Sequence, residues 1–157
     1  MCKNFKFLKD INIFFSYSHK DEGMRDELEK HLTMLKRNGI ISTWHDRKIE
    51  ASSILDSEID KNLKNADIIL LLVSIYFLAS DYCYDIEMEQ ALEMHNNKQA
   101  VIIPIILRNC DWSDAPFSHL AALPTDAKCV SSWDNKDDAF FNIEKGIKKV
   151  AIELKNK

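Results

Sequence analysis

The chain has 157 residues, of which 46% are hydrophobic and 29% are charged, and it carries a formal net charge of −4. This size and composition predict one globular domain with its own core and argue against an intrinsically disordered chain. The negative charge, with lysine and arginine scattered along the sequence, argues against nucleic acid as a main partner, because phosphate binding usually shows as a basic excess on one face.

Five short, largely apolar segments predict strands, and helical periodicity predicts the helices between them. We expect an N-terminal extension over residues 1–10 and a single domain over residues 11–157. The predicted strands are 11–16, 40–44, 67–74, 100–107 and 128–131. The first predicted helix has Met24, Leu28, Leu32 and Leu35 inward and ends with basic residues before Gly39. A short second helix has Ile59 and Leu63 on one side, a third carries Glu87, and a fourth covers 137–154.

The alternation of strands and helices predicts a parallel sheet covered by helices on both faces, a flavodoxin-like three-layer α/β fold. The expected strand order is 2-1-3-4-5. In such a sheet, ligands bind beyond the carboxyl ends of the strands, at the switch point between strands 1 and 3. The loops at 16–21 and 74–81 therefore border the predicted site, and the second loop leads into the helix that carries Glu87.

The helix after the third strand carries a carboxylate on its apolar side. Glu87 falls on one helical face together with apolar or half-apolar neighbours, while Asp85 and Glu89 fall on the opposite, solvated side. A carboxylate near the edge that packs on the sheet needs either a buried partner or a function. The residues that share the face of Glu87 are Cys83, Tyr84, Met88, Ala91 and Leu92.

Common cofactor and metal motifs are absent from the sequence. It has three glycines and neither a GxGxxG fingerprint nor a phosphate-binding P-loop, which removes the usual redox and NTPase functions. Receiver domains share the strand order, but they need acidic residues at the end of strand 1, where this chain reads FFSYS. The four cysteines show no CxxC spacing and are predicted to be free thiols, and neither they nor the five histidines have metal-ligand spacing.

No segment predicts a membrane span or a secretory signal. The longest apolar runs, IILLLV at 68–73 and VIIPIIL at 101–107, are far shorter than the roughly 20 residues that cross a bilayer. The N-terminal MCKNFKFLKD has basic residues without the apolar stretch and cleavage site of a signal peptide. We therefore expect a cytoplasmic protein.

Three motifs carry a family resemblance that extends over residues 12–152. They are FFSYSHKD at 14–21, WHDRKIEASSIL at 44–55 and SIYFLASDYCYDIEMEQAL at 74–92. In this order, they resemble the strand-A signature, the BB loop and the glutamate-bearing helix of TIR (Toll/interleukin-1 receptor) domains, in particular those of prokaryotic defence. The resemblance therefore implies the TIR fold.

The resemblance also implies a reaction, because many TIR domains of this type cleave the nicotinamide–ribose bond of NAD. Their glutamate matches Glu87 in this chain. Nicotinamide leaves as a neutral base without a general acid, and a nearby anion stabilises the oxocarbenium character of the ribose. Without the motif, Glu87 would be interpreted as the partner of a Lys or Arg at the helix edge.

The resemblance places substrate contacts in the loop after strand 1, at Tyr17, Ser18 and His19. The family contacts substrate phosphate and ribose there. The structural alternatives are a turn, a helix cap at Ser18 and an exposed histidine at His19.

Further contacts are implied in the BB loop and beside the glutamate. The BB loop shapes the nicotinamide side of the family site, against the alternative of a solvated charged loop. Tyr82 and Tyr84 are candidates to stack on a substrate ring, against core packing for one of the two. The implied BB-loop contacts are Trp44, Asp46, Arg47 and Glu50.

Two positions depart from the family pattern. Enzymatic relatives often have Trp four residues before the glutamate, where this chain has Cys83, so Tyr82 or Tyr84 would supply the aromatic surface. The BB loop has Ser52 where Gly is common, which predicts a different loop shape wherever φ must be positive.

The sequence thus predicts a TIR-type NAD glycohydrolase that is activated by self-assembly and acts as an effector in bacterial antiphage defence. NAD is expected as substrate, with ADP-ribose or its cyclic form as product and with neither cofactor nor metal. The other expected partners are further TIR domains and a sensor domain or protein, and we expect no membrane or direct nucleic-acid contact. Two alternatives stay open: a non-catalytic adaptor that signals by homotypic contacts, and an enzyme acting on another N-glycoside.

Overall fold

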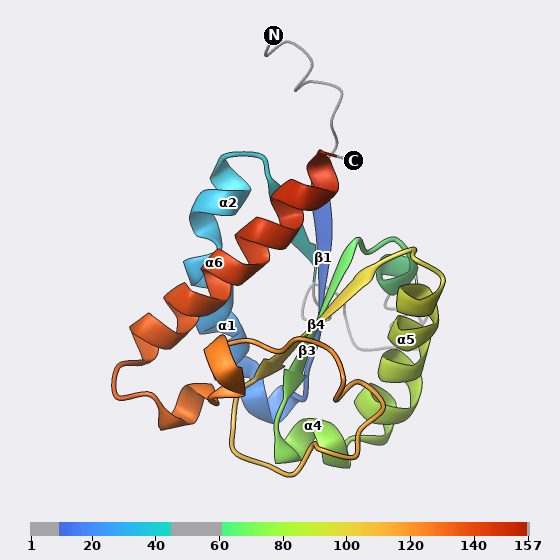
Figure 1. The fold of residues 1–157 in the computed structure, drawn as a ribbon, viewed down its shortest axis with the longest axis vertical. Coiled ribbons are helices and arrows are strands. Elements are labelled where there is room, and N and C mark those ends of the chain that lie inside the picture. The colour runs from blue at the N-terminus through green and yellow to red at the C-terminus, as the bar shows by residue number, and fades with distance from the viewer. Residues whose placement is uncertain (1–9, 45–60, 157) are drawn as a thin grey trace, which may run out of the picture.

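The computed structural model describes residues 10–44 and 61–156, apart from the side chains of Trp44 and Tyr82. In this part of the chain, four parallel strands form one sheet in the order β2-β1-β3-β4 (Figure 1). The predicted parallel α/β fold and its first four strands are confirmed. These strands are β1 (Ile11–Ser16), β2 (Ile41–Trp44), β3 (Ile68–Val73) and β4 (Val101–Ile106).

The strand β3 lies at the centre of the core, and all six of its side chains are fully buried. Alternate residues of β3 face opposite sides of the sheet, with Leu70 in one apolar cluster and Leu71 in the other. Because both faces are covered, its sequence is continuously apolar.

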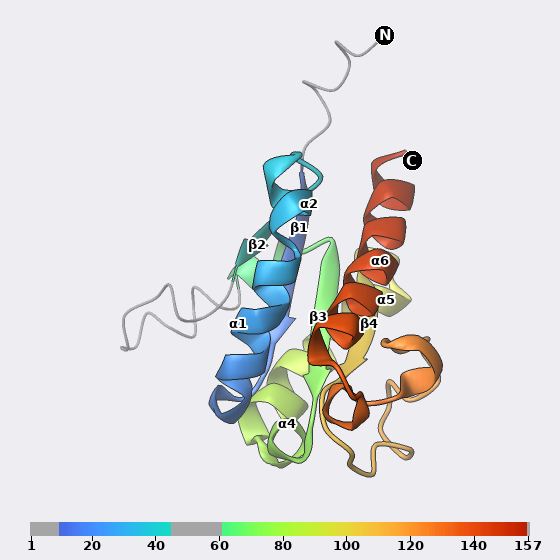
Figure 2. The same cartoon turned by 90° about the vertical axis from the view of Figure 1, so that its left-hand side faces the viewer.

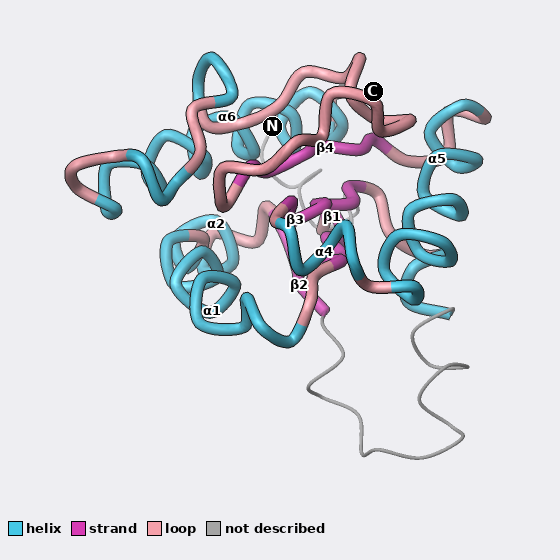
Figure 3. The backbone as a smooth tube through the Cα atoms, turned by 90° about the horizontal axis from the view of Figure 1, so that it is seen from below, coloured by secondary structure: helices cyan, strands magenta, loops and turns pink. Residues whose placement is uncertain are grey.

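Helices cover both faces of the sheet and make three layers (Figures 1 and 3). The helices α1 (Glu22–His31), α2 (Thr33–Arg37) and α6 (Lys136–Lys155) pack on the face that carries Leu70. The helix α5 (Met88–Asn96) and the helical residues 61–64 pack on the other face. None of the helices in the described residues combines the length and the apolar character needed to cross a membrane.

The first predicted helix is broken at Leu32 into α1 and α2. The backbone of Leu32 leaves the helical region, with φ −91° and ψ 4°, and the Thr33 hydroxyl donates a hydrogen bond to the Lys30 carbonyl at 2.6 Å. A side-chain hydroxyl that bonds a nearby carbonyl competes with the helical ladder. The break still leaves Leu28, Leu32 and Leu35 in one core cluster.

The predicted fifth strand at 128–131 is wrong. The position beside β4 is taken by Leu123, which donates to the Pro104 carbonyl and accepts from the Ile106 N–H, both at 2.9 Å. Pro104 of β4 has no N–H to donate, and neither has Pro124, which follows Leu123. A regular ladder therefore cannot form along this edge. The chain instead makes two short 3₁₀ turns, η5 (Thr125–Ala127) and η6 (Val130–Ser132), and Val130 fills the core.

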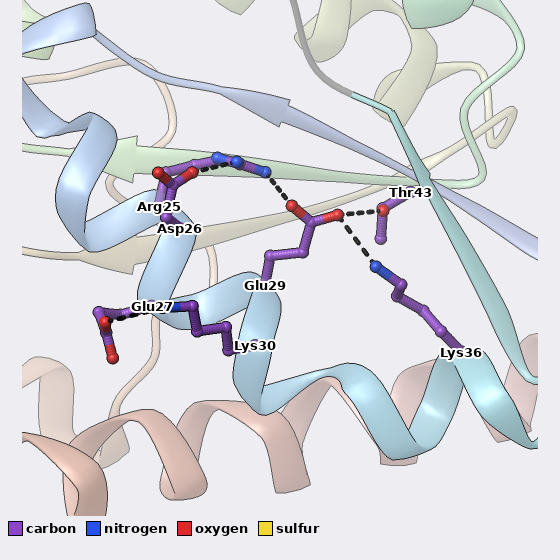
Figure 4. Close-up of polar contacts among 7 residues, drawn as sticks. All are labelled: Arg25, Asp26, Glu27, Glu29, Lys30, Lys36 and Thr43. Atoms are coloured by element: carbon purple, nitrogen blue, oxygen red, sulfur yellow. Dashed lines mark hydrogen bonds and ion pairs between the residues drawn. The ribbon is translucent and has the colours of Figure 1, made fainter. Parts of the chain in front are cut away.

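A partly buried ion network joins α1 to the edge strand β2 (Figure 4). Glu29 accepts hydrogen bonds from Arg25 at 2.5 Å, from Thr43 of β2 at 2.7 Å and from Lys36 at 3.1 Å. Burial alone raises the pKa of Glu29, but the hydrogen bonds from Thr43, Lys36 and Arg25 and the Arg25 charge outweigh it and lower the pKa from 4.5 to about 2. Glu29 is therefore the anion that holds these three groups together.

Candidate functional site

The candidate site lies at the carboxyl ends of β1 and β3, the end of the sheet on which Figure 3 looks. Ser16 is the last residue of β1, and Ser74 directly follows β3. Because the strand order reverses between these neighbours, this is the switch point at which open α/β sheets bind ligands. Both serine side chains are fully buried.

Glu87 lies in this place with its side chain withdrawn from water. It is 5% exposed, and its Oε1 accepts a hydrogen bond from the Ser16 hydroxyl at 2.6 Å. Cys83, Met88 and Ala91 are buried with it, as their common helical face predicts, while Glu89 is exposed. The expectation of a buried carboxylate on the sheet side of this helix is confirmed.

A π-helical segment, η4 (Asp81–Glu87), carries Glu87 and joins α4 (Ile75–Ala79) to α5. The Ser80 hydroxyl caps it by accepting from the Cys83 N–H at 3.1 Å, and the Cys83 thiol donates to the Tyr17 carbonyl at 3.2 Å. The segment is thus tied to the end of β1 at Cys83 as well as at Glu87. π-helical turns within α-helices are rare and often occur at functional sites.

The residues after β1 take partly structural positions. Tyr17 is 4% exposed and lies in the core cluster on the α1 side, with the Arg25 guanidinium 5.7 Å from its ring centre. The Ser18 hydroxyl accepts from the Lys20 N–H at 3.2 Å and so caps η2 (His19–Asp21). His19 is exposed and lies with its ring edge toward Tyr17, at 6.3 Å between ring centres. Whether any of the three contacts a substrate stays a prediction.

The structure brings Tyr84 to a neighbouring cavity. Tyr84 is half-buried and, with Leu78, Asp111, Asp114 and Ala115, lines a cavity of about 250 Å³. The other aromatic and BB-loop positions, namely Tyr82, Trp44, Asp46, Arg47 and Glu50, have side chains that lie outside the described residues.

The sequence analysis missed a second buried carboxylate, at Asp21. Asp21 is fully buried, and its two oxygens accept hydrogen bonds from the Ser74 hydroxyl and, at 2.8 Å, from the Arg108 Nε. One carboxylate thus joins the segments that follow β1, β3 and β4. The signal was available, because all three residues stand at or shortly after the carboxyl ends of predicted strands, where parallel strands bring their loops together.

The arrangement can support catalysis in which a carboxylate stabilises a positively charged transition state. A buried carboxylate oriented by a hydroxyl stabilises positive charge that develops close by, because little water competes for it. In the described parts of the chain, no group of three or more His, Cys, Asp or Glu residues is placed to hold a metal ion.

Solved structures with a similar fold are TIR domains. The TIR domain of the Toll-related receptor TRR-2 from Hydra magnipapillata matches with a TM-score of 0.59 at 20% identity, over 86% of this chain and 96% of that one. The TIR domains of the activated Roq1 resistosome, which recognises the effector XopQ, match with a TM-score of 0.51 at 16% identity, over 90% of this chain and 84% of that one. At these identities, the likeness concerns the fold.

Sequence comparison assigns the family. The uncharacterized protein y4lF of Sinorhizobium fredii is 54% identical over 140 residues, which cover 89% of this chain and 43% of that protein. The chain therefore spans less than half the length of this relative. The sequence model of the TIR domain matches residues 13–143, most of the chain, and the chain belongs to the TIR domain family.

Proposed function

We propose that this TIR domain is an NAD glycohydrolase in which Glu87 is the catalytic carboxylate. The observation that carries the proposal is the burial of Glu87 at the switch point of the sheet, where Ser16 donates to it at 2.6 Å. The family resemblance supplies the reaction, and NAD is consumed as a substrate, without a further cofactor. The products are nicotinamide and ADP-ribose or a cyclic form of ADP-ribose.

The proposed reaction needs one anion beside the ribose. The bond between C1′ and the nicotinamide nitrogen breaks, its electron pair leaves with neutral nicotinamide, and C1′ gains oxocarbenium character. The Glu87 carboxylate stabilises that charge in a site with little water. Water then adds to C1′ and loses a proton, or an atom of the same molecule closes the ring.

The burial of Glu87 favours activation by assembly. A carboxylate that is 5% exposed offers little surface to a ribose, so movement of neighbouring segments would improve its contact with substrate. Contact with a second TIR domain can provide that movement, and TIR domains of similar fold occur in the activated Roq1 resistosome. We infer that the isolated domain is weakly active and that homotypic assembly opens the site.

The proposed role is that of an effector in bacterial antiphage defence, inside the cytoplasm. The relative y4lF is more than twice as long as the matched region, so a protein of this kind has room for a sensor beside its TIR domain. A sensor that clusters TIR domains would trigger NAD loss on infection.

The test compares Glu87→Gln with Glu89→Gln. Glu89 is an exposed carboxylate two residues further along, on the opposite side of the helix, so its substitution removes the same charge outside the site. Each protein is clustered on a multivalent scaffold and incubated with NAD, and nicotinamide release is followed by chromatography. We expect the wild type and Glu89→Gln to release nicotinamide and Glu87→Gln to lose about a hundredfold or more of that rate.

Release by Glu87→Gln at the wild-type rate, or no release by the clustered wild type, contradicts the proposal. Nucleosides other than NAD form a second arm, and base release from these alone indicates an enzyme for another N-glycoside. The alternative of a non-catalytic adaptor is favoured by the exposed apolar side chains of Ile75 and Ile86, which are 55% and 56% exposed at this end of the fold. It predicts homotypic association without base release.

A further inference from the structure

Two cations converge on one aromatic ring at the carboxyl end of the sheet. The Arg108 guanidinium carbon lies 5.5 Å from the centre of the Tyr76 ring, and the Lys20 ammonium lies 5.9 Å from the same point. Lys20 follows β1, Tyr76 follows β3 and Arg108 follows β4. The three side chains are at least partly exposed, with Tyr76 and Arg108 both 39% exposed.

Asp21 binds the Nε edge of the Arg108 guanidinium and leaves its two terminal nitrogens available to a ligand. Its Nε donates to the fully buried Asp21, and within the described residues this is its one ion pair. The two terminal nitrogens of the guanidinium carry four further N–H donors. Because Asp21 fixes one edge of the guanidinium, and the side chain is 39% exposed, these donors have little conformational freedom left to lose when they bind a ligand.

Lys20 adds a second positive charge that no carboxylate among the described residues neutralises. Among the described residues, it pairs with no carboxylate, and its ammonium approaches the Tyr76 ring instead. Asp21 offsets one of the two positive charges, so the group of Lys20, Arg108 and Asp21 keeps a net charge of +1. Like charges gathered on one ring repel each other, and a bound anion relieves that repulsion.

We propose that Lys20, Tyr76 and Arg108 form a phosphate-binding site that receives the pyrophosphate of a nucleotide. A fixed guanidinium offers paired N–H donors that match phosphate oxygens, and the lysine that approaches the same ring adds a mobile point charge for a second phosphate. The site lies at the same end of the sheet as Glu87. The inference rests on the proposed function in one respect, because a dinucleotide whose ribose reaches Glu87 must place its phosphates nearby.

Binding to a Glu87→Gln background tests the site without turnover. Isothermal titration measures the affinity for ADP-ribose, ADP, inorganic pyrophosphate, inorganic phosphate and adenosine. We expect the diphosphates to bind more tightly than adenosine, with an affinity that falls as salt rises. Vesicles with anionic phospholipid headgroups form a further arm, and binding to vesicles with no affinity for ADP overturns the assignment to a nucleotide.

The variants are Lys20→Gln and Arg108→Gln, with Lys145→Gln as the matched control. Lys145 is a lysine of α6 that lies 5.3 Å from the ring centre of exposed Phe141, so its substitution removes the same type of contact elsewhere. We expect each site variant to weaken ADP binding by about tenfold to a hundredfold and the control to leave it unchanged. Lys20→Gln carries the test if Arg108→Gln does not fold, because Lys20 is exposed and pairs with no buried carboxylate in the part of the chain that the structure describes.

Equal affinity of Lys20→Gln and the control for ADP overturns the site, and so does adenosine binding as tight as ADP binding. These outcomes are separate from those for the proposed function. Tight ADP binding by a protein that never releases nicotinamide supports the site and contradicts the glycohydrolase. Nicotinamide release with an unchanged KM in Lys20→Gln supports the glycohydrolase and contradicts the site.

Discussion

Glu29 and Glu87 are both helix carboxylates that lie largely out of water, but their partners differ. Glu29 is 17% exposed and is held by two cations and a hydroxyl. Glu87 is 5% exposed and accepts from a serine hydroxyl. The cations around Glu29 fit a role in stabilising the fold, whereas the burial of Glu87 at the switch point fits a functional role.

Glu29 makes the fold sensitive to acid. Its pKa in the folded chain, about 2, lies below its usual value of 4.5, so its contribution is fully present above about pH 4.5 and is lost as the pH falls through 2. That contribution is at most about 3 kcal/mol. We expect Glu29→Gln to lower the free energy of unfolding at pH 7 and to differ less from the wild type at pH 3, as measured by urea denaturation.

The control for this prediction is Glu27→Gln on the same helix. Glu27 is 52% exposed and lies 3.6 Å from the Lys30 ammonium, so its substitution should change stability by less than about 0.5 kcal/mol at either pH (Figure 4). An equal loss for the two variants, or a loss for Glu29→Gln that does not depend on pH, contradicts the assignment of acid sensitivity to Glu29.

At the scale of elements, two helical glycines differ in their surroundings. A Cβ at Gly23 of α1 would meet nothing within 4 Å, but a Cβ at Gly146 of α6 would lie 2.6 Å from Leu123 Cδ1. Leu123 is the residue that occupies the edge of β4. The close approach of α6 to this segment therefore depends on the missing side chain.

Alanine at these two glycines should act in opposite directions. Gly23→Ala should stabilise the fold by about 0.5–1 kcal/mol through helix propensity, whereas overpacking against Leu123 should make Gly146→Ala destabilising by about 1 kcal/mol. The measurement is thermal and urea unfolding. In a Leu123→Ala background, Gly146→Ala should become stabilising, and a Gly146→Ala that stabilises the wild type by itself argues against this packing.

At the scale of the whole molecule, assembly should control activity. If a second TIR domain exposes Glu87, the rate per mole of protein rises with protein concentration, because the fraction in contact rises. We expect nicotinamide release to grow faster than linearly between about 1 and 100 μM protein and to become linear once the chains are fused to an oligomeric scaffold. A strictly linear dependence in the unfused chain would falsify activation by assembly.

The sequence predicts the parts of this fold that depend on local pattern. The boundaries of β1 to β4 follow from apolar runs, and the burial of Glu87 follows from its place among Cys83, Met88 and Ala91 on one helical face. The segment at 128–131 is short and apolar enough to predict a strand. It does not form one because Leu123 occupies the edge of β4 and because Pro104 and Pro124 lack an N–H. Neither cause can be read from residues 128–131 themselves.

The buried charges were the least predictable part. Arginine is rarely fully buried, yet Arg25 is fully buried beside the rings of Phe15 and Tyr17. Its burial depends on two carboxylates of the same helix and on aromatic residues in β1 and just after it. Likewise, Asp21 and Arg108 come together from distant positions in the chain, and only the sheet order makes them neighbours.

The strand order has a consequence for the synthesis of the protein. β1 is made first, but it gains β3 as its inner neighbour only when Ile68 and the residues after it have been added, because Ile13 pairs with Ile68. Pairing between such distant segments is slow, and an unpaired apolar strand is prone to aggregate until it is covered. Glu87 follows β3 and meets Ser16 only after this pairing. A nascent chain on the ribosome therefore cannot assemble the carboxylate site until most of the domain has been synthesised.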